Sequence, residues 1–181
     1  MAQGIDQSRE RLIAELEDLA QLEPEKWMRA ERMNLLPRRC ILAIAAVVDI
    51  ALNARQMPVA AKALAERHDL PARHLESLLQ SLVRADILKG VRGPRGGYEL
   101  ARERRRISAG EVVRAVLPDV IDEQQLAKGS RLAVEVVLPI AIVASSSLLD
   151  HLDSVFIAQL CDRATEGQIF SEKQIIPDFT I

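Results

Sequence analysis

Apolar residues recur at helical spacing along most of this chain, and short runs rich in Pro, Gly and Asp interrupt them. The first apolar run lies within residues 8–33 and predicts an amphipathic helical leader. Residues 38–54 are apolar on almost every side, which predicts a helix buried on most of its surface. A short helix over 59–67, a turn, and a further helix over 71–84 follow. Two helices joined by so short a turn indicate a helix-turn-helix.

The helix over 71–84 has two distinct faces. Five apolar residues, three or four positions apart, form a stripe that predicts the buried face. The opposite face carries Arg73, Ser77, Gln80 and Arg84. Arginine, glutamine and serine are side chains that bond to phosphates and to base edges in the major groove of DNA. Because many solvated helices have a polar outer face, this pattern alone leaves open whether the helix contacts DNA.

A short β-hairpin is predicted directly after this helix. Residues 87–91 and 98–101 have strand character, and the sequence RGPRGG at 92–97 is typical of a tight tip. A nucleotide-binding loop is the competing interpretation of the glycines, but no Lys-Ser or Lys-Thr pair follows them. A hairpin after a helix-turn-helix indicates the wing of a winged helix. Arg92 and Arg95 at its tip carry charge suited to a minor groove.

The last third of the chain predicts helices again. The sequence SAGE at 108–111 predicts a capping box that begins a helix ending near residue 117. After a polar linker, residues 130–154 are more apolar than one surface helix requires, so we expect this helix to pack against a partner. A shorter helix over 157–163 follows. The predicted fold class is mainly α with a small β-hairpin wing: a winged helix-turn-helix plus a long C-terminal dimerisation helix.

Composition and charge narrow the class of protein. The chain has 181 residues, 49% of them apolar, which is enough for one core or two small ones. Its net charge of −2 is unremarkable, but residues 54–106 contain twelve basic and six acidic residues and are therefore +6, which leaves −8 elsewhere. A basic middle indicates that one module meets a polyanion. Five aromatic residues are too few for the stacking platforms of single-stranded RNA binders.

Export, membrane and catalytic signals are weak. The polar N-terminus lacks the apolar core of a signal peptide, and the segment 132–149 carries Glu135, Pro139 and three serines, unlike a clean membrane span. We therefore expect a cytoplasmic protein without a membrane segment. Cys40 and Cys161 form no zinc or disulfide pattern, although Cys161 is the better candidate for a reactive thiol. No nucleophile and base can be paired, so we expect no enzyme activity and no cofactor or metal.

Three stretches of the chain, within residues 36–164, resemble one known family. They are PARHLESLLQSLVRADILKGVRGPRGGYELAR at 71–102, ISAGEVVRAV at 107–116 and LDSVFIAQL at 152–160. On these motifs the chain is similar to the Rrf-two family of bacterial winged-helix regulators, the group of IscR, NsrR and CymR type. The resemblance implies a homodimer that places one recognition helix and one wing per subunit on a near-palindromic DNA site. It also implies that Arg73, His74 and Glu76 begin the helix that reads bases.

The chain departs from the family pattern in two places. Cluster-binding members of the family carry three cysteines before the long dimerisation helix, and residues 118–135 here contain none. The resemblance therefore does not extend to an iron-sulfur cluster of that type. The family also begins near its first helix with a basic stretch and a tyrosine, whereas this chain has about 33 extra residues in front. Arg38 and Arg39 are the expected substitutes for those N-terminal DNA contacts.

The expected function is a dimeric, sequence-specific DNA-binding transcriptional regulator, acting as a repressor, with double-stranded DNA and a protein or small-molecule effector as partners. The alternative is a protein-interaction scaffold that keeps the fold without reading DNA. The expected segments are a helical extension (1–35), the winged helix-turn-helix (36–117), a linker (118–129), dimerisation helices (130–165) and a tail (166–181). The expected DNA-contacting residues are Arg38, Arg39, Arg73, His74, Glu76, Ser77, Gln80, Arg84, Lys89, Arg92, Arg95, Gly96, Gly97 and Tyr98. The expected dimerisation residues are Val137, Ile140, Leu148, Leu149 and Leu152.

Overall fold

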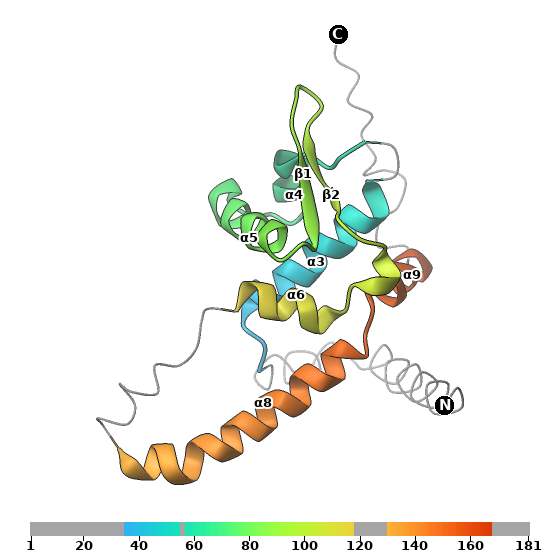
Figure 1. The fold of residues 1–181 in the computed structure, drawn as a ribbon. Coiled ribbons are helices and arrows are strands. Elements are labelled where there is room, and N and C mark those ends of the chain that lie inside the picture. The colour runs from blue at the N-terminus through green and yellow to red at the C-terminus, as the bar shows by residue number, and fades with distance from the viewer. Residues whose placement is uncertain (1–34, 55–56, 118–129, 168–181) are drawn as a thin grey trace. The chain divides into compact units, whose positions relative to one another are not determined.

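The computed structural model describes residues 35–54, 57–117 and 130–167 (Figure 1). Residues 38–181 belong to one compact unit, and only this unit is described below. The expected leader helix, the linker 118–129 and the tail beyond residue 167 lie outside the described residues. In chain order the elements are α3 (Arg38–Asn53), α4 (Ala61–Arg67), α5 (Ala72–Arg84), β1 (Leu88–Val91), β2 (Gly97–Leu100), η1 (Arg104–Arg106), α6 (Ala109–Val116), η2 (Ala133–Val137), α8 (Leu138–Asp153) and α9 (Ile157–Glu166).

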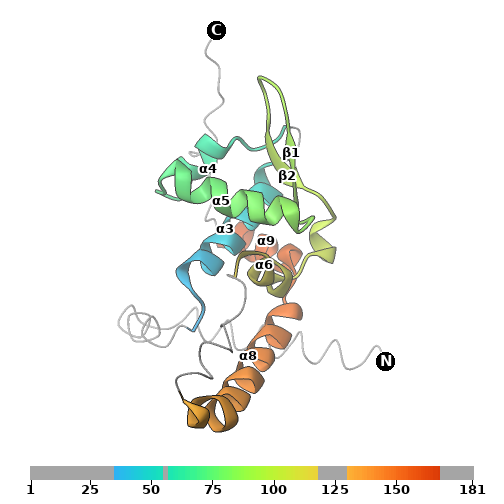
Figure 2. The same cartoon turned by 60° about the vertical axis from the view of Figure 1, so that its left-hand side comes forward.

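Helix α3 is the centre of the core, as its nearly uniform apolar sequence predicts. Cys40, Ala43, Val47 and Ile50 along it are completely buried. Helices α5, α6 and α9 and strand β2 all contact α3, so that it is covered from several directions (Figure 2). A helix that is apolar on most of its surface is stable only in such a position.

The helix-turn-helix consists of α4, a turn over 68–71, and α5. Asp69 has a positive φ of 49°, and the Leu70 amide donates to the Ala65 carbonyl at 3.0 Å, which closes the C-terminal end of α4. Pro71 has an extended conformation and precedes the first helical residue of α5. The apolar stripe predicted for this helix is its buried face, since Leu75, Leu79 and Leu82 are essentially inaccessible.

The wing, residues 88–100, is an antiparallel hairpin that pairs Leu88 with Leu100 and Val91 with Gly97. It projects from the body beside α5 (Figure 1). Val59, expected to begin α4, instead forms an isolated antiparallel bridge with Tyr98. Its amide and carbonyl both bond to Tyr98 at 2.9 Å. The backbone pairing of Val59 with strand β2 ties the wing to the start of the helix-turn-helix.

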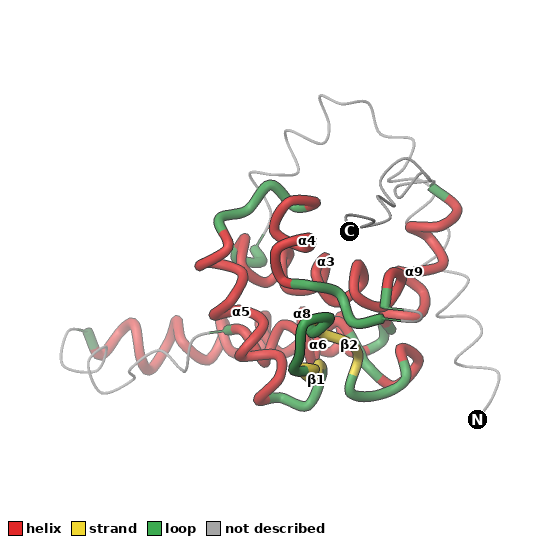
Figure 3. The backbone as a smooth tube through the Cα atoms, turned by 90° about the horizontal axis from the view of Figure 1, so that it is seen from above, coloured by secondary structure: helices red, strands yellow, loops and turns green. Residues whose placement is uncertain are grey.

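The long apolar segment forms a nearly continuous helix, η2 followed by α8, which extends away from the body (Figure 3). Residues 133–137 form a π-helical turn immediately before Pro139. Proline has no amide hydrogen and its ring crowds the preceding turn, so a local widening there is the usual accommodation. Among the described residues, Ala133–Asp153 is the one helix that is long and apolar enough to cross a membrane by length and composition. One such helix is weak evidence for a span, because helices of soluble proteins pass the same test.

Helix α9, which the sequence analysis groups with the dimerisation helices, packs one face on the body of its own chain. Ile157 and Cys161 are fully buried and Ala164 is nearly so, and α9 contacts both α3 and η1. These three residues lie three or four positions apart, so they form the single apolar stripe of a helix packed on a core. Residues 157–166 therefore complete the body of the winged helix.

Candidate nucleic-acid interface

The outer face of α5 presents a row of polar side chains to solvent. Arg73, Glu76, Ser77, Gln80 and Arg84 are exposed, whereas the leucines between them are buried. Arg84 bonds to the Ser81 hydroxyl at 3.2 Å, and that hydroxyl bonds to the Ser77 carbonyl at 3.2 Å. The side chain of His74 lies outside what the structure describes. The face predicted from helical spacing is thus the exposed face, and it carries both donors and acceptors.

Arg38 and Arg39 lie beside the first half of α5, although about 35 residues separate them from it in sequence. Together with Asp69, Pro71 and Ser77 they line a hollow of about 530 Å³ with an apolar floor. Both arginines are exposed and begin α3. The structure therefore brings the two residues expected as substitute N-terminal contacts next to the predicted recognition helix.

The wing supplies a second exposed basic group. Arg92 and Arg95 are exposed at the hairpin tip, where Gly93 has a φ of 124° that residues with a side chain rarely adopt. Lys89 is paired with Glu99 at 3.1 Å, so part of its charge is already neutralised. Among the wing residues expected to contact DNA, Arg92 and Arg95 have charge available for phosphates.

Gly96, Gly97 and Tyr98 have internal roles that the sequence did not indicate. A Cβ added at Gly97 would lie 2.4 Å from the Val59 carbonyl oxygen, and one at Gly96 would lie 2.4 Å from that of Val91. Both distances are far shorter than an ordinary contact, so the two glycines allow the hairpin to close on itself and on residue 59. Tyr98 is half-buried and pairs with Gly90, next to the tip end of the hairpin. The predicted close approach of these glycines to DNA stays a prediction, and the structure adds a steric requirement inside the protein.

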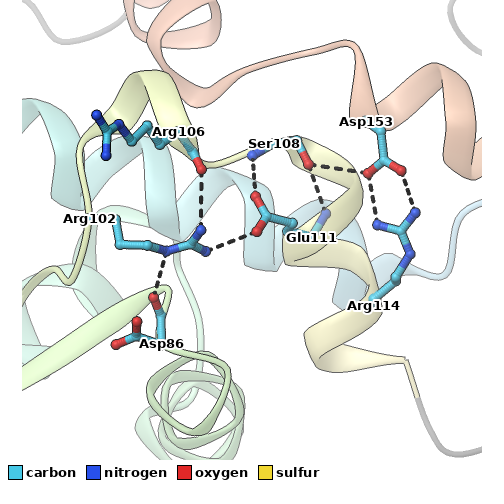
Figure 4. Close-up of polar contacts among 7 residues, drawn as sticks. All are labelled: Asp86, Arg102, Arg106, Ser108, Glu111, Arg114 and Asp153. Atoms are coloured by element: carbon cyan, nitrogen blue, oxygen red, sulfur yellow. Dashed lines mark hydrogen bonds and ion pairs between the residues drawn. The ribbon is translucent and has the colours of Figure 1, made fainter.

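The base of the wing is fastened by Arg102 (Figure 4). Its guanidinium donates to the Asp86 carbonyl at 3.1 Å and to the Arg106 carbonyl at 3.3 Å, and it pairs with Glu111 at 3.0 Å. Asp86, with a φ of 54°, lies in the turn between α5 and β1. One side chain thus joins the end of the predicted recognition helix, the exit of the wing and α6.

A buried carboxylate holds the end of α4. Asp49, within α3, is fully buried; it accepts bonds from Arg67 at 2.6 and 2.8 Å and from Asn53 at 2.9 Å. The Nε2 atom of His68 lies 3.1 Å from the same carboxylate. Burial alone would raise the pKa of Asp49, but the adjacent His68 ring, together with the bonds from Arg67 and Asn53, outweighs it and holds the pKa below its usual value. Sequence reasoning missed this cluster, and its signal was a lone acid within an apolar helix.

Comparisons with known proteins identify the family to which this winged helix belongs. Residues 36–163 match the Rrf2 (Rrf-two) family, described as iron-dependent transcriptional regulators. The chain belongs to the Rrf2 family. A stretch of 92 residues is 39% identical to an HTH-type transcriptional regulator of Synechocystis, which is 48% of this chain and 63% of that protein. A stretch of 74 residues is 39% identical to the regulator IscR of Vibrio cholerae, 41% of this chain and 43% of that protein. The chain thus spans about half the length of the curated relatives that it matches.

Solved structures show the same fold. IscR of T. potens matches with a TM-score of 0.59 and 30% identity over 76% of this chain and 93% of that one. CymR of B. subtilis, titled the global cysteine regulator, matches with a TM-score of 0.54 and 21% identity over 72% of this chain and 98% of that one. The winged-helix fold is therefore shown for this Rrf2 chain. The named relatives are transcriptional regulators and not enzymes.

The iron in the description of the Rrf2 family does not fit the thiols of this chain. Within the described residues, no three His, Cys, Asp or Glu side chains are grouped so that they could hold a metal ion. Cys40 and Cys161 are free and completely buried in α3 and α9. Burial raises the pKa of both thiols, against the opposing effect of Arg39 on Cys40 and of Arg104 on Cys161. Iron-sulfur clusters need several accessible thiolates, and neither cysteine meets that requirement.

Proposed function

We propose that this Rrf2 protein is a sequence-specific DNA-binding transcriptional regulator that acts as a homodimer in the cytoplasm. The carrying observation is the outer face of α5, flanked by Arg38 and Arg39 on α3 and by the wing arginines Arg92 and Arg95. Among the described residues, none of these four guanidinium groups nor that of Arg73 has a carboxylate partner. Unpaired guanidinium groups around one exposed polar helix are the arrangement that binds a duplex.

The two parts of this surface have different tasks in the proposal. Arg73, Ser77 and Gln80 lie on a helix that fits a major groove, so they read base edges. Arg92 and Arg95 lie on the neighbouring hairpin and position the protein on phosphates or in the adjacent minor groove. Such a dimer represses transcription where its binding site overlaps a promoter.

The exposed apolar surface of η2 and α8 supports the homodimer. Ile140, Val143 and Val136 are 69%, 66% and 53% exposed, and the candidate membrane-crossing window of this helix has no buried residue. Leaving this surface in water would cost roughly 25 cal/mol per Å². Leu148, Leu149 and Leu152 are already half-buried within the single chain, so the exposed residues at the other end of the helix, Val137 and Ile140 among them, are the stronger candidates for the dimer contact.

The proposal is tested by selecting bound duplexes from a genomic fragment library with the purified protein. Gln80→Ala or Arg73→Ala should cost about 1–3 kcal/mol on the selected operator and relax the preference at one base pair per half-site. Arg92→Ala or Arg95→Ala should weaken specific and random duplexes alike. Each should also lower the slope of log affinity against log salt by about one for every phosphate that a subunit no longer binds.

Arg131→Ala is the control for charge, because Arg131 is exposed and already paired with Glu135 at 2.9 Å. It should leave both the affinity and the salt slope unchanged. If the protein selects no duplex, or if the helix variants bind every duplex as the unaltered protein does, the regulator proposal fails. The scaffold function would then explain the fold of the chain better.

A further inference from the structure

The C-terminal end of α8 is clamped against the start of α6. The Ala109 amide donates to the Val155 carbonyl at 2.8 Å, and the Ile157 amide donates to the Ile107 carbonyl at 2.9 Å. This pair of bonds makes Ser108 and Phe156 partners in a short antiparallel bridge. The long helix is therefore joined to the winged helix by more than the continuity of the chain.

Asp153, the last residue of α8, carries the side-chain part of this junction (Figure 4). Its carboxylate accepts bonds from Arg114 at 2.8 Å and from the Ser108 hydroxyl at 3.2 Å, and its second oxygen is paired with Arg114 as well. The bonds from Arg114, aided by Ser108, hold the pKa of Asp153 below its usual value despite some desolvation. The carboxylate is therefore charged, and bound on both oxygens, near neutral pH.

Gly110 shows how closely the two helices approach. A Cβ at this position would lie 2.0 Å from an Asp153 carboxylate oxygen and 3.0 Å from the Asp153 backbone nitrogen. A larger residue at this position would displace the Asp153 carboxylate from its place in the junction and crowd the Asp153 backbone. The junction is thus held by backbone hydrogen bonds and by a bidentate ion pair, and Gly110 allows the two helices to come this close.

The same contacts continue to the DNA-facing elements (Figure 4). Ser108 caps α6 by accepting from the Glu111 amide at 3.1 Å, while its own amide donates to the Glu111 carboxylate at 2.9 Å. Glu111 pairs with Arg102, which bonds to the Asp86 carbonyl between α5 and the wing. A row of polar contacts therefore runs from α8 to the base of both DNA-facing elements.

From this we propose that Asp153 is a positioning residue that fixes the angle between α8 and the winged helix, and so sets the spacing of the two DNA half-sites that the dimer accepts. The inference rests on the proposed function, because α8 is the dimer contact there. The helix Ala133–Asp153 has 21 residues, a length of roughly 30 Å. A tilt of about 10° at the junction moves its far end by roughly 5 Å, more than the base-pair rise of about 3.4 Å. Loss of the junction therefore widens the range of accepted spacings by about one base pair in either direction.

The test compares operators that differ only in half-site spacing. The selected operator is prepared with its own spacing, with one base pair added and with one removed, and a single half-site is prepared as well. The protein variants are Asp153→Asn, Arg114→Gln and Arg114→Lys. Glu166→Gln is the control for the loss of a surface charge, since Glu166 is an exposed carboxylate and the last residue of α9. Sedimentation verifies that every variant remains a dimer.

The unaltered protein and Glu166→Gln should bind the altered spacings at least tenfold more weakly than the selected one. Asp153→Asn and Arg114→Gln should reduce that difference to threefold or less while binding the single half-site with unchanged affinity, and Arg114→Lys should restore most of it. Hydrogen exchange at the Ala109 and Ile157 amides should become faster in the first two variants only. A merely stabilising ion pair would lower the thermal midpoint but leave the spacing preference intact.

An unaltered protein that binds all spacings equally, or variants that keep its preference, overturns the inference while the proposed function stands. A protein that selects no duplex overturns the proposed function itself. If Asp153→Asn does not fold, Arg114→Gln against Arg114→Lys decides the matter, because the two substitutions remove and keep the same charge.

Discussion

Asp49 is a fully buried carboxylate within the apolar helix α3. A carboxylate without solvent needs partners, and it finds them in Arg67, Asn53 and His68. Arg67 and His68 end α4 and immediately precede the turn into α5. The position at which α5 begins is therefore coupled to one side chain in the middle of α3.

We expect Asp49→Asn to lower the free energy of unfolding at pH 7 by about 3 kcal/mol, because it leaves the largely buried Arg67 without its counter-charge. Urea unfolding measures this. Asp150→Asn, an exposed acid on α8, should change the value by less than about 0.5 kcal/mol.

Asp49→Asn should also alter the dependence of stability on pH. The native pKa of Asp49 lies below its unfolded value, so its contribution is complete above the unfolded pKa and is lost as the pH falls toward the native pKa. Urea unfolding between pH 3 and pH 7 should therefore show a loss of stability at acidic pH that is smaller in Asp49→Asn. Parallel curves for the two proteins would contradict this assignment.

Burial raises the pKa of the cysteines, whereas the pKa of Asp49 is lowered by its partners. Cys161 was the better candidate for a reactive thiol, but its sulfur is buried near the Val48 carbonyl, and burial raises its pKa. Because the thiolate is the reactive form, native protein should react with iodoacetamide at pH 7.5 at least tenfold more slowly than unfolded protein. Anaerobically purified protein should also be colourless. Rapid native labelling of Cys161 would show that the helix opens there.

At the scale of elements, the wing is held by a backbone bridge to Val59 that periodicity did not indicate. Val59 pairs with Tyr98 only because Gly97 leaves room for its carbonyl. Sequence patterns predicted the hairpin from its glycine-rich tip. The bridge at Val59 involves a single residue, so no alternation of apolar and polar residues could indicate it. Its pairing was therefore visible only in three dimensions.

Gly97→Ala should destabilise the protein by roughly 1–3 kcal/mol, because the new methyl group would overlap the Val59 carbonyl. Gly90→Ala is the matched control on the other strand, since an added Cβ there meets nothing within 4 Å. It should change stability by less than about 0.5 kcal/mol. Thermal unfolding of both variants measures the difference, and equal midpoints would argue against the steric role of Gly97.

At the scale of the whole molecule, the main open surface is that of η2 and α8. Ile140→Asp with Val143→Asp should convert a dimer into a monomer, because both residues are exposed in the single chain and their change leaves its core intact. Sedimentation at micromolar concentration measures the mass. Ser145→Asp, on the opposite side of α8 from Val143, should remain dimeric. An unaltered protein that sediments as a monomer, or that binds neutral lipid vesicles, would contradict the dimer.

Much of this protein follows from its sequence alone. The helix-turn-helix, the wing, the capping box of α6 and the polar outer face of α5 were all predicted, because each is encoded by neighbours within about ten residues. Turns, caps and helical faces are local properties, so spacing and residue type are sufficient to place them. The positive net charge of residues 54–106 likewise follows from counting charged residues along the sequence.

Only the tertiary structure decided which distant residues meet. It placed α9 in the core of the winged helix, joined Asp49 to Arg67 and His68, and brought Asp153 to Arg114 across 39 positions. It also showed that Gly97 and Gly110 are needed for close contacts inside the protein. The physical reason is that burial and ion pairing depend on which helices pack together, and the periodicity of one helix does not specify the neighbour that covers it.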